Sequence, residues 1–155
     1  MLFTRIRSGA FVVKNKKVLL FQRSLGYWYF LGGQVEKGET PEKGAIREVE
    51  EETGIKVKLT KLLYVRELRR RGDRTLELIY LAKAVGGKLR LCNDPEEKYQ
   101  MTKLEYIPIN SINKALFLTP ALIDEIEKDA KNSFKDCPRD LGISKSNFKK
   151  FLTKR

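Results

Sequence analysis

The sequence predicts one α/β domain built on a mixed β-sheet, and two observations lead to this fold class. Segments rich in β-branched and apolar residues, which are typical of strands, lie on both sides of an acidic helix at about residues 41–53. A second amphipathic helix follows the last of these segments, so helices are expected to cover the sheet in layers. The 155 residues, 41% of them hydrophobic, suffice for one domain with a core.

Strands are predicted where apolar residues are dense or alternate with polar ones. The first two are joined by a polar turn at Asn15, and the last is expected to be the final strand of the sheet. The predicted strands cover residues 4–13, 17–23, 56–66, 76–84 and 104–109. Gly32 and Gly33 are expected to form a glycine-rich turn that leads toward the acidic helix.

The limits of the acidic helix follow from three residues. Thr40 can cap the first free amides, Pro41 suits the first helical position, and Gly54 suits a left-handed stop. The second helix repeats this start with Thr119 and Pro120 and is expected to extend to about residue 131.

One face of the acidic helix gathers the carboxylates of Glu48, Glu51 and Glu52, at i, i+3 and i+4. Like charges at this spacing destabilise a helix by roughly 0.2 to 0.5 kcal/mol per pair, and a bound cation would reverse that effect. Carboxylates without thiols or imidazoles favour hard ions such as magnesium, which is often held together with substrate phosphates. The alternative is an acidic surface that only faces water.

Composition excludes several classes of chemistry. Histidine is absent, which removes imidazole bases, Ser-His or Cys-His pairs and histidine metal ligands. Cys92 and Cys137 are too few for a disulfide framework or a zinc site. No apolar run approaches the roughly 18 residues of a membrane span, and Arg5 and Arg7 interrupt the start, so a cytoplasmic protein without a membrane partner is expected.

The stretch from the paired glycines to the end of the acidic helix resembles the box of the Nudix hydrolases, of which MutT-like proteins are members. That box is G-x5-E-x7-R-E-U-x-E-E-x-G-U, with U a bulky aliphatic residue. All nine specified positions are filled, by Gly33, Glu39, Arg47, Glu48, Val49, Glu51, Glu52, Gly54 and Ile55. One departure is Leu31, where the family usually has proline before the paired glycines.

The resemblance implies an α/β/α Nudix sandwich over about residues 4–130 and a hydrolase that acts on phosphoanhydride bonds. It also implies that Mg²⁺, or alternatively Mn²⁺, is bound by Glu48, Glu51 and Glu52, and that the carbonyl of Gly32 joins them. Arg47 and Glu39 would hold the carboxylates in place. A loop acid before the last strand would act as a metal ligand or as the base, and Glu96 and Glu97 are the candidates for it.

Substrate contacts are less well defined by the sequence. The candidates are Arg23, Trp28, Arg70 and Arg71, although core packing is favoured over base stacking for Trp28. Nudix subtypes are often distinguished by a proline or tyrosine after the box, and residues 68–72 contain neither. The resemblance therefore gives no support to ADP-ribose or to diadenosine polyphosphates as the substrate.

The net charge of +12 is concentrated in two places. Residues 66–74 carry a net charge of +3, and residues 131–155 carry +6. The catalytic domain is therefore assigned to residues 1–133, and residues 134–155 to a basic tail with a short docked helix as one alternative.

Three functions remain open at this stage. The first is hydrolysis of a small nucleotide, such as a sugar nucleotide, a dinucleoside polyphosphate or a nucleoside triphosphate. The second is an RNA 5′-pyrophosphohydrolase in which the tail and the arginine-rich residues 66–74 hold RNA. The third is a nonenzymatic nucleotide- or RNA-binding module. The small nucleotide is favoured as partner, RNA is the alternative, and a homodimer is left open.

Overall fold

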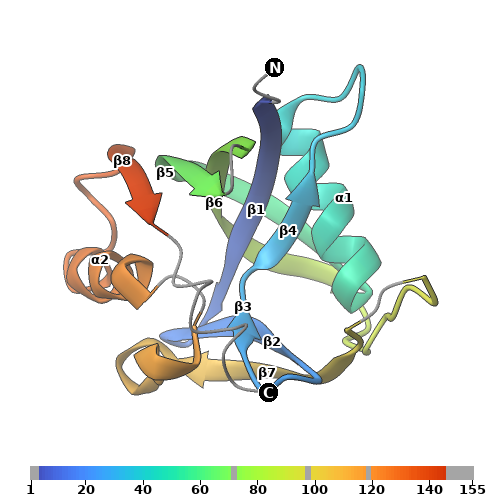
Figure 1. The fold of residues 1–155 in the computed structure, drawn as a ribbon. Coiled ribbons are helices and arrows are strands. Elements are labelled where there is room, and N and C mark those ends of the chain that lie inside the picture. The colour runs from blue at the N-terminus through green and yellow to red at the C-terminus, as the bar shows by residue number, and fades with distance from the viewer. Residues whose placement is uncertain (1–3, 71–72, 97–98, 118–119, 146–155) are drawn as a thin grey trace.

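The computed structural model describes residues 4–70, 73–96, 99–117 and 120–145. Two α-helices, two short 3-10 helices (Ile109–Ser111 and Lys114–Leu116) and eight strands are present in this part of the chain (Figure 1). The strands and α-helices are β1 (Thr4–Lys14), β2 (Lys17–Arg23), β3 (Trp28–Tyr29), β4 (Leu31–Gln34), α1 (Pro41–Thr53), β5 (Ile55–Arg70), β6 (Asp73–Gly87), β7 (Met101–Pro108), α2 (Pro120–Ala130) and β8 (Arg139–Lys145).

The described strands form one mixed sheet in the order β3-β2-β1-β6-β5-β8, with β4 paired to β1 and β7 paired to β2. Strands β1 and β6 run parallel, whereas β5 and β6 form a long antiparallel hairpin. The parallel pairing sets Arg7 opposite Glu77, and the hairpin sets Arg66 opposite the same Glu77. Residues far apart in the sequence are thereby placed side by side.

Helices cover both faces of the sheet, because neighbouring residues of a strand point to opposite faces. Ala10 and Val12 of β1 pack with Val49 of α1, whereas Phe11 packs with Leu122 of α2. Figure 1 shows α1 and α2 on the two sides of the central strands. This is the α/β/α arrangement expected from the sequence. No helix in the described ranges is long and apolar enough to span a membrane.

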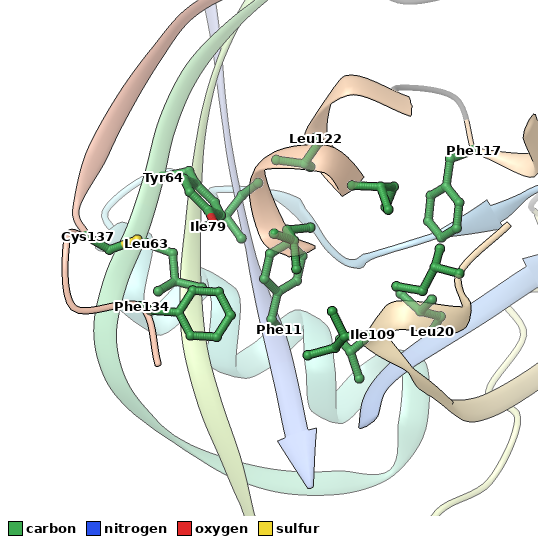
Figure 2. Close-up of a cluster of buried hydrophobic side chains, with 14 residues drawn as sticks. Phe11, Leu20, Leu63, Tyr64, Ile79, Ile109, Phe117, Leu122, Phe134 and Cys137 are labelled. Carbon is green, nitrogen blue, oxygen red and sulfur yellow. The ribbon is translucent and has the colours of Figure 1, made fainter. Parts of the chain in front are cut away.

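The larger core cluster is centred on Phe11 (Figure 2). Leu63 and Tyr64 of β5 lie on one side of this ring, and Leu20 and Phe117 lie on the other. The rings of Phe11 and Tyr64 meet nearly edge to face, with centroids 6.3 Å apart. This cluster fastens α2 to the sheet and leaves the opposite face to α1.

Several sequence predictions agree with the structure, and two do not. The acidic helix spans Pro41–Thr53, and both predicted hairpin strands at the start of the chain are present. Gly32 and Gly33 lie in strand β4, paired with β1, rather than in a turn. The strand predicted at 104–109 is β7, Met101–Pro108, and it is not the last, because β8 follows α2.

Strand β8 lies in the segment that the sequence analysis assigned to a tail. It pairs in parallel with β5, so residues 139–145 extend the sheet at its edge. The helix considered around Phe148 falls outside the described residues. The missed strand is explained by its partner, since pairing with β5 comes from tertiary structure and leaves no local pattern.

A buried acid holds the start of β8 against α2. The Asp129 carboxylate is 2% exposed and accepts hydrogen bonds from the Tyr64 hydroxyl, at 2.8 Å, and from Nε of Arg139, at 3.0 Å. Burial would raise the pKa of Asp129, but the hydrogen bonds from Arg139 and Tyr64 outweigh it and hold that pKa below its usual value. Asp129 therefore stabilises the fold in its charged form.

We expect Asp129→Asn to lower the free energy of unfolding by about 3 kcal/mol, because it removes the charge that pairs with Arg139. The contribution of Asp129 is present above the unfolded pKa and is lost as pH falls through the folded one. Chemical denaturation at several pH values checks this. The difference between wild type and variant should shrink in acid, and a constant difference would contradict the assignment.

Candidate active site

Helix α1 is fixed at both ends by the predicted capping residues. The Thr40 side chain accepts a hydrogen bond from the amide of Lys43, and Pro41 occupies the first turn. At the other end Gly54 adopts φ 72°, and its N–H donates to the carbonyl of Glu50 at 2.8 Å. These caps set where the helix begins and ends behind strand β4.

Arg47 gathers the acidic residues around its guanidinium. Nε and Nη2 donate to the two oxygens of Glu39, at 2.9 and 3.0 Å. Nη1 donates to Glu48 and to Glu51, each at 3.0 Å, and Nη2 also donates to the Gln34 carbonyl, at 3.0 Å. Hydrogen bonds from Arg47 lower the pKa of the Glu39 carboxyl. Arg47 therefore joins helix α1, strand β4 and the loop between them.

Glu48 lies directly against the backbone of β4. A Cβ added at Gly33 would be 2.2 Å from the carboxyl carbon of Glu48, so a side chain at position 33 would displace this carboxylate. Burial raises the pKa of Glu48, although the hydrogen bond and charge of Arg47 oppose the shift. Glycine at this position is needed to make room for the acid.

Glu52 contacts Gly32, the residue before Gly33 in strand β4. The peptide N–H of Gly32 donates to Oε2 of Glu52 at 2.9 Å. Burial raises the pKa of Glu52 to about 8, against the opposing charge of Arg7 and the bond from Gly32, and the charge of Glu48 raises it further. The charge of Glu48 therefore acts on Glu52.

These donors fit a hard divalent cation. Carboxylate and carbonyl oxygens are the ligands that magnesium prefers, and a cation beside Glu48 and Glu52 would offset the burial that disfavours their charged forms. Glu51 differs, since its side chain is 59% exposed and is held by Arg47. Among the described residues no group of three Asp, Glu, Cys or His side chains is already gathered for a metal.

Two of the predicted substrate residues lie on β2 and β3. The guanidinium of Arg23 lies over the rings of Phe21 and Tyr29, 5.3 and 5.6 Å from their centroids, and donates to the Tyr99 carbonyl. Burial raises the pKa of Glu52, and the charge of Arg23 is among those that oppose this rise. Trp28 packs against the larger core cluster, which agrees with the packing alternative for this residue.

Other predicted residues are not brought to the acidic helix or cannot be placed. Arg71, Glu97 and the side chain of Arg70 lie outside what the structure describes. Glu96 is exposed, and its amide donates to Asp94 within the same loop. The predicted loop acid therefore remains a prediction.

Most described arginines of the hairpin formed by β5 and β6 are already paired with glutamates of the same hairpin. Arg69 and Arg74 both pair with Glu67, at 2.5 and 2.8 Å, and Arg66 pairs with Glu77 at 2.6 Å. An anionic ligand on these arginines would have to compete with the bonds already present. The local sequence shows the positive charge but not this pairing.

Sequence reasoning missed Arg7, whose Nη2 donates to the carbonyl of Gly32. Arg7 also pairs with Glu77, 70 residues away in the chain, at 3.1 Å. One sequence signal could have pointed to Arg7. It is a charged residue that alternates in phase with Phe11 and Val13, so it lies on the face of β1 that packs against the core. Its partners could not be predicted without the order of the strands.

Comparison with known proteins gives a family match over most of the chain. The family model described as the NUDIX domain matches residues 4–125. An ADP-ribose pyrophosphatase of Methanocaldococcus jannaschii is 31% identical over 112 residues, which cover 68% of this chain and 63% of the relative. An 8-oxo-dGTP diphosphatase of Proteus vulgaris is 41% identical over 63 residues, covering 37% of this chain and 56% of the relative. The matches thus span less than two thirds of each of these relatives.

Solved structures show the same fold. A MutT NUDIX hydrolase from Burkholderia pseudomallei superposes with a TM-score of 0.68 at 27% identity, covering 79% of this chain and 97% of that one. A NUDIX hydrolase from Nitrosomonas europaea gives a TM-score of 0.71 at 20% identity, covering 92% and 79%, and this likeness supports the fold alone. The box is complete, the family model matches most of the chain, and the fold is the same. The chain therefore belongs to the Nudix hydrolase family.

Proposed function

We propose that this protein is a metal-dependent pyrophosphohydrolase that cleaves a phosphoanhydride bond in a nucleoside diphosphate or triphosphate derivative. The observation that carries the proposal is the pair of carboxylates, Glu48 and Glu52, set against Gly33 and Gly32 of β4. Burial raises the pKa of both, and a bound cation would favour their charged forms. A binding module would gain nothing evident from this arrangement.

Mg²⁺ is the proposed cofactor, with Mn²⁺ as the alternative. Its candidate ligands are Glu48, Glu51, Glu52 and the carbonyl of Gly32. A bound ion would neutralise phosphate charge and lower the pKa of a coordinated water, which a diphosphate otherwise repels. Glu48, Glu51, Glu52 and the loop acids Glu96 and Glu97 are the candidates to accept the proton of the water.

In this proposal Arg47 positions the acids rather than touching the substrate. It binds both oxygens of Glu39 and one oxygen each of Glu48 and Glu51. It also donates to the Gln34 carbonyl of β4. A planar fork of donors suits such an arrangement, since an ammonium group cannot present two parallel N–H bonds from different nitrogens to the two oxygens of one carboxylate.

We expect Arg47→Lys to lower kcat by about 10- to 100-fold, because loss of the two-point contact with Glu39 loosens Glu48. Steady-state kinetics with saturating Mg²⁺ measures this. Arg5→Lys, a matched change at an exposed position of β1, should leave kcat unchanged. An Arg47→Lys enzyme with the wild-type kcat would remove Arg47 from the proposed machinery.

The substrate class is proposed from the site and from the relatives together. An ADP-ribose pyrophosphatase and an 8-oxo-dGTP diphosphatase are among the similar proteins. Both names describe nucleotides with a phosphoanhydride bond, the group that a cation held by Glu48 and Glu52 would bind. We therefore propose small nucleotides as substrates, acted on in the cytoplasm, where the two free cysteines would stay reduced.

A substrate panel tests the proposed function. It contains ADP-ribose, a sugar nucleotide, a dinucleoside polyphosphate, several nucleoside triphosphates including 8-oxo-dGTP, and 5′-triphosphorylated RNA. We expect phosphate or nucleoside monophosphate release from a small nucleotide with Mg²⁺ and none with excess chelator. If no member is hydrolysed with either Mg²⁺ or Mn²⁺, the proposed activity is wrong.

RNA is the weaker candidate, because three of the hairpin arginines already pair with Glu67 or Glu77. Removal of residues 146–155 tests the contribution of the basic residues in that segment, and the cut lies beyond the last residue of β8. If RNA is the substrate, its affinity should fall and depend less on salt, whereas hydrolysis of a small nucleotide should not change.

A further inference from the structure

Arg7 is a partly exposed charged residue that contacts strand β4 of the site. It lies on β1, and its side chain is 37% exposed, so it is partly accessible to solvent. Nε donates to Oε1 of Glu77 at 3.1 Å, and Nη2 donates to the carbonyl of Gly32. These two bonds use two of the five N–H groups of the guanidinium and fix its plane.

Glu77 is itself held from the other side. Arg66 donates through Nε to Oε2 of Glu77 at 2.6 Å, and the side chains of Arg66 and Glu77 are 5% and 11% exposed. The three residues are direct neighbours across β1, β6 and β5 in the register of the sheet. The two buried members therefore form a rigid support for Arg7.

Arg7 and Arg66 share the single carboxylate of Glu77. Buried ion pairs are often no more stabilising than apolar residues of the same volume, so stability alone does not account for this arrangement. An anion bound to Arg7 would supply a further acceptor for its remaining N–H groups.

Arg7 is also electrically coupled to the acids of α1. Its charge opposes the burial that raises the pKa of Glu52, and it acts in the same direction on Glu48. Gly32 connects the two groups directly, since its N–H binds Glu52 and its carbonyl binds Arg7. Arg7 and the proposed metal ligands therefore lie on either side of one residue of β4.

We propose that Arg7 contacts the phosphate oxygens of the substrate, as a fixed cation beside the carboxylate pair. The inference rests on the proposed function and adds to it a residue outside the family's box. Arginine suits the task because its remaining donors match two oxygens of one phosphate. The Glu77–Arg66 pair serves to hold Arg7 in this orientation before the substrate arrives.

Calorimetry with α,β-methylene-ADP tests the contact without turnover. This analogue keeps the diphosphate but has a CH₂ group in place of the bridging oxygen, and it is titrated into the protein with Mg²⁺. We expect Arg7→Ala to weaken binding by about 10-fold or more, and Arg7→Lys to recover part of the loss. Arg5→Ala is the control, because it removes the same charge from an exposed position on the same face of β1 and should change affinity less than twofold.

Mn²⁺ binding without nucleotide separates contact with the substrate from support of Gly32. If Arg7 contacts the phosphate, Arg7→Ala binds Mn²⁺ as tightly as wild type or more tightly, because a nearby positive charge has gone. Equal losses of Mn²⁺ and analogue affinity would show a structural role and overturn the proposal. Wild-type analogue affinity in a folded Arg7→Ala protein would overturn it too.

Failure of this inference can be told apart from failure of the proposed function. A wild-type protein that hydrolyses nucleotides, with an Arg7→Ala variant that binds the analogue normally, rejects the role of Arg7 alone. A wild-type protein that neither hydrolyses any nucleotide of the panel nor binds the analogue rejects both.

Discussion

Glu52→Gln should lower Mg²⁺-dependent hydrolysis by about 10²- to 10⁴-fold while the protein stays folded. The loss follows from removing one charge at the proposed metal site, which is worth several kcal/mol of transition-state stabilisation. The fold should survive because burial already favours the neutral form of Glu52, and the amide oxygen of glutamine can still accept the N–H of Gly32. Initial rates across a Mg²⁺ titration measure the effect.

Glu50→Gln is the matched control, since Glu50 is on the same helix and is exposed. It should retain nearly all activity, so comparable losses in both variants would sink the assignment. In excess chelator the stability of the wild type should fall as pH rises from 4.5 to about 8, because the folded protein keeps a proton on Glu52 that the unfolded chain has released. The stability of Glu52→Gln should not show this pH-dependent fall.

Gly32→Ala and Gly33→Ala should fail in different ways although they are neighbours. Gly32 has φ 145°, and an added Cβ would be 2.4 Å from the carbonyl oxygen of Ser8 and 2.5 Å from Cα of Gly9. Both obstacles are backbone atoms of β1, which is paired with β4 at this point. Gly32→Ala should therefore lower the free energy of unfolding by about 2 to 5 kcal/mol.

Gly33→Ala meets a movable obstacle instead. Its Cβ would be 2.2 Å from the carboxyl carbon of Glu48, which is the end of a flexible side chain. We expect a stability change below about 1 kcal/mol but at least about a 10-fold loss of kcat, because Glu48 must leave its position. Denaturant titrations and kinetics on both variants test the contrast. Equal loss of stability in the two variants would contradict this prediction, because it would show that Gly33→Ala disturbs the backbone of β4 rather than the side chain of Glu48.

The helix that carries the acids was predictable because its signals are local. Thr40, Pro41 and Gly54 define its ends within the segment itself, and the structure has α1 at Pro41–Thr53. Its identity as the Nudix box required only residue types at fixed spacing. Trp28 was left between two roles, and its place against the core cluster depended on packing that the sequence does not contain.

What could not be predicted depends on residues distant in the chain. Strand β8 exists through its pairing with β5, and β4 exists through its pairing with β1, so the paired glycines looked like a turn when taken alone. The positive charge of the hairpin suggested a phosphate surface, yet Glu67 and Glu77 already pair with most of its described arginines. Arg7 could be recognised only when strand order placed it beside Glu77.

Mn²⁺ binding followed by electron paramagnetic resonance tests the central claim most directly, because it reports the metal site without any assumption about the substrate. Wild-type protein should bind Mn²⁺, and Mg²⁺ should compete for the site. Glu48→Gln and Glu52→Gln should each weaken binding at least about 10-fold, whereas Glu50→Gln should bind as wild type does. Unchanged Mn²⁺ affinity in both Glu48→Gln and Glu52→Gln would contradict a metal centre at these carboxylates.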